Sequence, residues 1–310
     1  MIRLTPLREL TLTTPSSRGR PPFLSAASGL VALGSHLYVV ADDELQLGRF
    51  PQSGDAPGEL LRLRPGLLPD AYAERKARKP DFEALVRLPP LDDRAAGTLL
   101  ALGSGSTPNR YTGALISVTE DGFLVGTSRA IDLGGIYRTI APRFHTLNIE
   151  GGVIVGEQLV LLQRGNKHQS QCAYVRLHLP DVLAALASTD SLGNVAPIGV
   201  RTYDLGAIDR VPLCFSDGAA LPDGSIVFSA IAEAAANSYD DGPCKGAAIG
   251  VTNSAGELRF LERVDRGHKI EGIEAQVDGT RVRLRLVTDA DDAAAPAQLL
   301  GAEIDGYPFR

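Results

Sequence analysis

The strongest constraint on the fold is a hairpin-like unit that recurs along the chain. Its clearest copy, residues 145–167, holds two apolar stretches that meet at Gly156, with Glu150 opening the first and Arg164 ending the second. Two short apolar strands joined at a glycine are typical of an antiparallel hairpin. Because the first strand starts where the second one ends, we expect Glu150 and Arg164 to lie side by side.

Four further segments share this layout: a small or acidic residue, then Gly or Ala, an apolar strand, a turn and a second apolar strand. The five copies start near Ser28, Glu83, Glu150, Ser216 and Glu271, so they follow one another at intervals of 55 to 67 residues. A repeat of this length suits a four-stranded propeller blade with loop insertions. Abundant Gly and Pro and short, evenly spaced strands also favour a closed all-β fold.

The two ends of the chain indicate how the repeats close. The last copy has room for only three strands, at 270–276, 281–287 and 298–304, while an isolated strand over 6–13 precedes the first copy. Pairing that strand with the last blade would remove an exposed sheet edge. We therefore predict an all-β, five-bladed β-propeller whose N-terminal strand closes the last blade, forming a single domain over 1–310. Six blades are the alternative, if a degenerate copy lies in the long spacers.

Charge and composition exclude several classes of partner. The net charge is −6 without basic clusters, which argues against nucleic acid. No apolar run reaches membrane-spanning length and the N-terminus lacks an apolar signal core, so we expect no membrane partner and a cytoplasmic protein. We also expect a monomer. The three cysteines have no metal-ligand spacing; Cys214 and Cys244 could pair within one blade, but free thiols are favoured.

The innermost strand of each blade would bring one oxygen-bearing side chain to the axis. These five side chains, called the ring residues below, are Ser28, Glu83, Glu150, Ser216 and Glu271. Three carboxylates close to one axis repel each other, so either protons or a cation must resolve the repulsion. Oxygen ligands without His or Cys select a hard ion, which predicts Ca²⁺ as the cofactor. The alternative is that these residues only start strands or hydrogen-bond across the channel.

Several of these segments resemble the calcium-activated nucleotidases, the soluble calcium-dependent apyrases. The resemblance covers the inner strands, from Ser28-Gly29-Leu30 and His36 to Asp42 through Phe82-Glu83, Ile149-Glu150, Phe215-Ser216 and Ile270-Glu271. It implies a five-bladed propeller with a central Ca²⁺ in a ring of serine and glutamate, a phosphate-facing Arg164, and Asp42 near an acidic pair at the mouth. Esterase-like and phytase-like propellers are similar in layout.

The chain departs from that family where a nucleotide would bind. After Asp42-Asp43 the sequence continues with Glu44-Leu45-Gln46 and lacks the family's arginine, Arg164 is followed by glycine instead of a second arginine, and there is no tryptophan to stack on a base. The metal ring therefore carries over better than nucleotide hydrolysis does. No nucleophile elbow, zinc-protease motif, phosphate loop or dinucleotide fingerprint suggests another chemistry.

Loops at the same face supply candidate ligand-binding and catalytic residues. A phosphate or carboxylate would suit a Ca²⁺ flanked by arginines, and Asp42 or His145 could act as general base, with Arg164 as the third catalytic candidate. The ligand-binding candidates are Lys79, Arg110, Asn166, Lys167, Lys269 and Asp289. The sequence thus predicts a Ca²⁺-dependent hydrolase of a small anionic ester, with a phosphate-type substrate favoured. The alternative is a non-catalytic binding propeller with a structural axial Ca²⁺.

Overall fold

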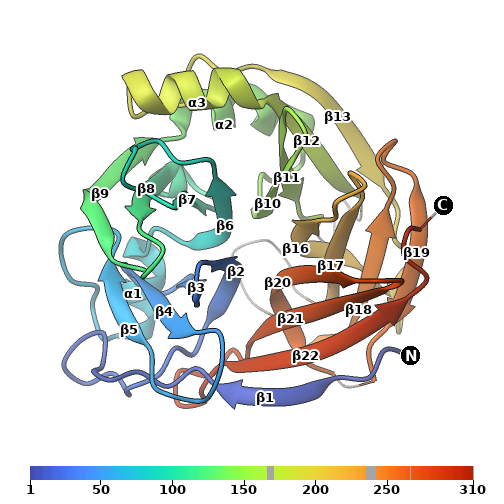
Figure 1. Ribbon diagram of the computed structural model, residues 1–310, viewed down its shortest axis with the longest axis horizontal. Coiled ribbons are helices and arrows are strands. Elements are labelled where there is room, and N and C mark those ends of the chain that lie inside the picture. Colours follow the sequence, from blue (N-terminus) through green and yellow to red (C-terminus); the bar gives the residue numbers. More distant parts are fainter. Residues whose placement is uncertain (166–170, 235–241, 266, 310) are drawn as a thin grey trace.

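Five antiparallel sheets of four strands surround one axis (Figure 1). The computed structural model describes residues 1–165, 171–234, 242–265 and 267–309. Strands β2, β6, β10, β16 and β20 lie nearest the centre, one from each sheet, and each contacts the inner strands of its two neighbours. The predicted five-bladed β-propeller is confirmed.

The blades follow the order of the chain. Blade 1 consists of β2 (Ala27–Leu33), β3 (His36–Ala41), β4 (Gln46–Pro51) and β5 (Glu59–Arg62). Blade 2 consists of β6 (Phe82–Leu88), β7 (Gly97–Gly103), β8 (Thr112–Val118) and β9 (Leu124–Asp132). Blade 3 consists of β10 (Ile149–Val155), β11 (Gln158–Gln163), β12 (Cys172–His178) and β13 (Pro197–Tyr203). Blade 4 consists of β16 (Cys214–Ala220), β17 (Ile226–Glu233), β18 (Cys244–Thr252) and β19 (Leu258–Arg263).

Blade 5 is closed by the N-terminal strand, as predicted. It consists of β20 (Lys269–Asp278), β21 (Arg281–Asp289), β22 (Gln298–Asp305) and β1 (Thr5–Glu9), with β1 antiparallel to β22. The closing strand ends at Glu9, earlier than the predicted 6–13. Beyond it, Leu10 and Leu12 are buried and bond outside this sheet, Leu10 N donating to Ala297 O at 2.9 Å and Leu12 N to Pro22 O at 2.7 Å.

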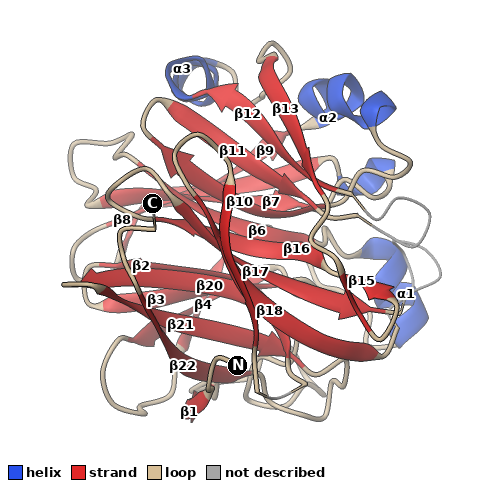
Figure 2. Ribbon diagram, turned by 90° about the vertical axis from the view of Figure 1, so that its right-hand side faces the viewer, coloured by secondary structure: helices blue, strands red, loops and turns tan. Residues whose placement is uncertain are grey.

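Short elements fill the connections between blades. They are α1 (Tyr72–Arg78), α2 (Gly134–Ile140), α3 (Leu179–Ser188), the 3₁₀ turns η1 (Pro108–Arg110) and η2 (Ala141–Arg143), and the ribbon of β14 (Ala207–Ile208) and β15 (Val211–Pro212). In the side view, α1 and α2 lie towards the same end of the propeller (Figure 2). Sequence reasoning missed α2, which opens with two glycines but buries Ile136, Tyr137 and Ile140. No helix among the described residues is long and apolar enough to cross a membrane.

A β-bulge interrupts every inner strand at the same position. The pairing with the second strand shifts register between residues 27 and 29, 82 and 84, 149 and 151, 215 and 217, and 270 and 272. The extra residue in each bulge is therefore the ring residue predicted from the sequence. A bulge re-aims the side chain that it carries, and bulges concentrate beside functional sites.

The residue after each bulge packs against the axis, where space is short. It is Gly29, Ala84, Gly151, Asp217 or Gly272. A Cβ on Gly29 would lie 2.8 Å from Leu85 N, and one on Gly151 would lie 2.9 Å from Asp217 Cα. The recurring Gly or Ala in the sequence repeat thus reflects the close approach of neighbouring inner strands.

Candidate functional site

The candidate site lies where the inner strands begin, at the end of the channel that also receives the ends of the second strands. We call this region the acidic mouth. The predicted contact between Glu150 and Arg164 is present, with Oε2 3.3 Å from Nη1. The two ring serines bond to backbone carbonyls: Ser28 Oγ donates to Ala26 O at 3.3 Å, and Ser216 Oγ lies 2.7 Å from Ile270 O.

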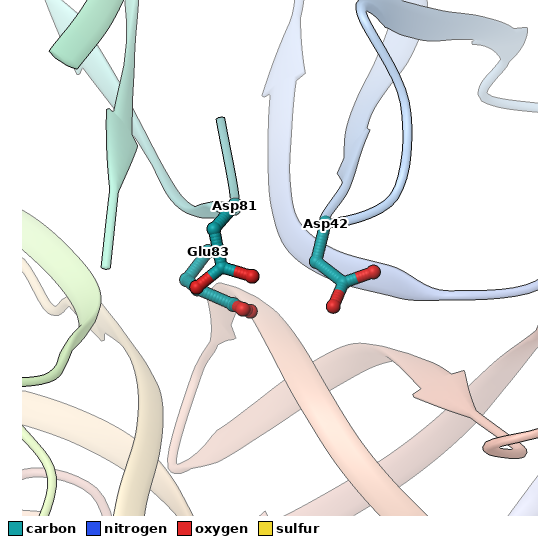
Figure 3. A group of neighbouring side chains, drawn as sticks. All are labelled: Asp42, Asp81 and Glu83. Atoms are coloured by element: carbon teal, nitrogen blue, oxygen red, sulfur yellow. The ribbon is translucent and has the colours of Figure 1, made fainter. Parts of the chain in front are cut away.

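Three carboxylates converge on one side of the mouth (Figure 3). Asp42 follows the end of β3, Asp81 precedes β6, and Glu83 is the bulge residue of β6. One carboxylate oxygen from each lies within 4.8 Å of the others. Two oxygens on opposite sides of a bound Ca²⁺, each about 2.4 Å away, would be about 4.8 Å apart, so this spacing is compatible with a shared ion.

Basic side chains hold two of these three carboxylates. Lys79, which follows α1, contacts Asp42 and lies 2.9 Å from Asp81. Arg110 Nη1 lies 2.7 Å from Asp81, and Ser104 Oγ donates to the same carboxylate at 2.5 Å. Glu83 has no ion pair or hydrogen bond among the described residues, and Lys79 acts on its charge only over a longer distance.

The other side of the mouth is a network of two cations and five carboxylates. Arg164 contacts Glu150, Glu233 and, at 3.9 Å, Glu271. Lys269 lies between 2.7 and 3.6 Å from four carboxylates; they belong to Glu233, Glu271, Asp289 and Asp291. Even so, Glu271 Oε2 is buried without a hydrogen-bond partner. An orphaned buried oxygen of this kind calls for a proton, a water or an ion.

Negative charge exceeds positive charge in the described part of the mouth. The carboxylates are Asp42, Asp81, Glu83, Glu150, Glu233, Glu271, Asp289 and Asp291, and the cations are Lys79, Arg110, Arg164 and Lys269. This excess and the burial of the groups resist ionisation. Burial, with Lys79 opposing it, raises the pKa of Asp42 to about 6; burial, with Arg164 opposing it, raises the pKa of Glu150 to about 8.

The same forces act on Glu83. Burial and the neighbouring Asp81 and Glu150 raise the pKa of the Glu83 carboxyl well above its ordinary value. For Lys79, burial alone would lower the pKa, but Asp42, Asp81 and Glu83 outweigh it and hold the pKa above the usual range. Without an added cation the mouth therefore retains protons on carboxyls at neutral pH, which is the outcome expected for crowded acids.

Asp217 is buried and directly follows the ring residue Ser216 in β16. Its Oδ2 accepts a hydrogen bond from Ile273 N at 3.1 Å, while its Oδ1 is buried without a partner. Burial raises the pKa of Asp217 well above its ordinary value, against the effect of backbone N–H donors that include Ile273. In the other four blades the equivalent position is Gly or Ala, so this one side chain fills space that the others leave.

The remaining predicted residues fall into three groups. His145 is exposed in the connection between η2 and β10. Arg110 is only 3% exposed and its guanidinium bonds to Asp81, Ser106 and Lys76 O, so it supports the trio from below. Asn166 and Lys167 lie outside the described residues.

Sequence reasoning missed Asp81, Glu233 and Asp217. Asp81 lies two residues before the ring position, as do Asn148 and Lys269 in their own blades, so a second polar position recurs in the repeat. Glu233 ends the second strand of blade 4, as Asp289 does in blade 5. Those two recurrences were available in the sequence. Asp217 was not, because it stands where the repeat otherwise has Gly or Ala.

Fold and site define a five-bladed β-propeller with a carboxylate-rich axial mouth. The chain belongs to a family of unknown function, DUF6929, whose model matches residues 23–304. No curated protein matches the chain.

Several solved structures are similar in layout. Endo-arabinase from Bacteroides thetaiotaomicron aligns with a TM-score of 0.49 and 12% identity over 97% of this chain and 99% of its own. Regucalcin, a calcium-binding protein from Agrobacterium tumefaciens, aligns at 0.44 and 11% over 93% and 95%. A gluconolactonase from Xanthomonas campestris aligns at 0.41 and 12% over 89% and 72%. At these scores the likenesses carry no argument about function.

Proposed function

We propose that the acidic mouth binds Ca²⁺ and that the protein is a metal-dependent hydrolase of a small anionic ester, with phosphate-type esters favoured. The observation that supports this most directly is the trio of Asp42, Asp81 and Glu83, whose oxygens lie within 4.8 Å of one another while Glu83 has no ion pair or hydrogen bond among the described residues. All the donors are oxygens, as a hard divalent cation requires. The resemblance of the inner strands to calcium-dependent apyrases agrees with this assignment.

In this proposal, the trio holds the ion and the other ring residues supply its negative surroundings. A bound Ca²⁺ would act as a Lewis acid towards an ester oxygen. Arg110 is a positioning residue, because it is buried and holds Asp81 in place. Arg164 and Lys269, at the opposite side of the mouth, are the candidates that orient the anionic substrate, and His145 is the candidate base from the exposed connection before β10.

A second candidate function is a non-catalytic binding propeller whose ion is structural. The favouring observation is that Lys79, Arg110, Arg164 and Lys269 all pair with carboxylates of the mouth. A substrate anion would have to compete with those carboxylates for the same cations. In this alternative, the ion completes the charge balance of the channel and the loops at the mouth recognise a ligand or partner.

Glu83→Gln separates these functions. It keeps the size of the side chain and removes the carboxylate that has no ion pair or hydrogen bond within the described part of the chain. Glu9→Gln, on the outer strand of blade 5, is the matched control. We would measure thermal unfolding with Ca²⁺ or chelator, and turnover of phosphate esters, carboxylic esters and lactones under the same conditions.

Under the hydrolase proposal, Ca²⁺ at a hundredfold excess over its Kd stabilises the wild type by about 3 kcal/mol, and both this effect and turnover disappear in the Glu83→Gln variant. Stabilisation without turnover on any substrate would favour the structural-ion alternative. Equal melting temperatures with and without Ca²⁺ for the wild type would rule out both.

A further inference from the structure

A groove of about 740 Å³ opens at the other end of the inner strands, away from the acidic mouth. Its walls come from blade 5, from the turn between β2 and β3 in blade 1, and from the end of β6 in blade 2. The side chains that matter below are Arg3, Arg87, Arg285, Glu274 and Gln52. None of them belongs to the mouth, so the groove is a separate feature of the molecule.

Positive charge dominates the lining. Four arginines and two glutamates reach the groove; they are Arg3, Arg87, Arg283, Arg285, Glu274 and Glu303. Arg283 forms ion pairs with Asp278 at 2.6 Å and with Glu303 at 3.5 Å. Among the described residues, the other three arginines have no carboxylate within ion-pairing distance. Their charges are therefore available to an anion.

Two of these arginines lie near one half-buried carboxyl, that of Glu274. Arg285 Nη1 donates to Gln52 Oε1 at 2.6 Å, which ties the last blade to the first. Glu274 accepts a hydrogen bond from Ala32 N at 3.2 Å across the same boundary. Burial raises the pKa of Glu274 to about 7, and Arg87 and Arg285 act against that rise. Both guanidinium groups therefore lie within electrostatic reach of this carboxyl.

We propose that this groove is a second ligand site, which binds a small dianion such as an organic phosphate or a short dicarboxylate through Arg87 and Arg285, with Arg3 at the side of β1. The volume lies in the range of small-molecule pockets, about 300 to 1,000 Å³. The planar guanidinium group forms paired hydrogen bonds with carboxylate or phosphate oxygens, which a lysine does not. Glu274 offsets part of the positive charge of the groove.

The test is calorimetric titration of the full chain with inorganic phosphate and, separately, with succinate. A chelator is present throughout, so that no divalent ion at the mouth contributes a phosphate site. We expect saturable binding of at least one probe to the wild type. Which of the two probes binds shows whether the groove prefers a tetrahedral dianion or a dicarboxylate.

Variants then locate the binding. Arg87→Gln and Arg285→Gln should each weaken it by about tenfold or more, the loss expected for one charge-assisted hydrogen bond. Arg259→Gln on β19, which removes an exposed arginine that pairs with Glu257 at 2.7 Å outside the groove, should keep wild-type affinity. Glu83→Gln should also keep it, since the mouth is at the other end of the strands.

Unfolding does not obscure the result, because Arg87 makes no hydrogen bond within the described residues and its loss leaves no partner unsatisfied. Circular dichroism of each variant confirms the fold before titration. The proposal is wrong if neither probe binds the wild type saturably, or if the Arg87→Gln and Arg285→Gln variants both bind as tightly as the wild type.

Discussion

The ionisation of Glu274 should make the stability of the protein depend on pH in a predictable direction. Burial raises the pKa of this carboxyl to about 7 from an unfolded value of 4.5. The folded chain therefore keeps a proton that the unfolded chain loses between these values, and stability falls as the pH rises from 4.5 to 7. The full difference corresponds to about 3 kcal/mol. Because the groove admits solvent, we expect about 2 kcal/mol to be observed.

Replacing Glu274 with glutamine removes the charge and keeps an oxygen that accepts the hydrogen bond from Ala32 N. The variant should match the wild type near pH 4.5 and exceed its free energy of unfolding by about 2 kcal/mol at pH 8.5. Urea denaturation followed by circular dichroism at the two pH values measures this, with Glu9→Gln as an exposed control on the same sheet. If the Glu274→Gln variant gained no stability over the wild type between pH 4.5 and 8.5, burial of the ionised carboxyl would carry no cost and the reasoning would fail.

Three further predictions concern the channel. Ca²⁺ binding at pH 7 should release on the order of one proton, because the pKa of Glu150 is about 8 and that of Glu83 is well above its ordinary value. Calorimetric titrations in buffers of different ionisation enthalpy measure this release. If no proton were released, the protonation of these carboxyls would be contradicted. Gly151→Ala should destabilise the fold by about 1 to 3 kcal/mol, because the added Cβ would lie 2.8 Å from Asp217 Oδ1. Gly199→Ala is the control and should not destabilise the fold, because the space around Gly199 is open. Urea denaturation compares the two variants. Asp217→Ala should cost about 1 to 3 kcal/mol by leaving the Ile273 N–H without its acceptor, and an unchanged midpoint would contradict this.

The architecture was predictable because two features of the repeat indicate it. The alternation of apolar strands and turns indicates the hairpins, and the Gly or Ala after the ring position in four of the five blades reflects the close approach of the inner strands at the axis. The closing role of the N-terminal strand followed from the missing strand of the last blade. What the pattern could not give is α2, whose buried Ile136 and Tyr137 pack through tertiary contacts behind two glycines that disfavour a helix locally.

The position of the site was predictable from the sequence, but the ion pairs between its residues were not. The ring residues lie where the repeat indicates, and Glu150 meets Arg164 because hairpin geometry is local. The sharing of Arg164 and Lys269 among carboxylates from blades 3, 4 and 5 depends on how the blades are angled about the axis, which no short-range pattern records. Asp81 is similar: its contact with Lys79 and Arg110 needs the chain after α1 and the η1 turn to meet, and both lie outside the repeat.

The bulge in β20 affects both the acidic mouth and the groove. In β20, Ile270 pairs with Thr288 and Gly272 with Val287, so Glu271 is the residue without a counterpart. Side chains alternate along a strand, and one extra residue exchanges the faces of everything that follows it. The bulge that aims Glu271 at the axis therefore also decides that Glu274 and Gln276 face the groove. If the side chains of β20 alternated strictly from its first residue, Glu274 and Gln276 would lie on the opposite face. The acidic mouth and the groove therefore both depend on this one bulge.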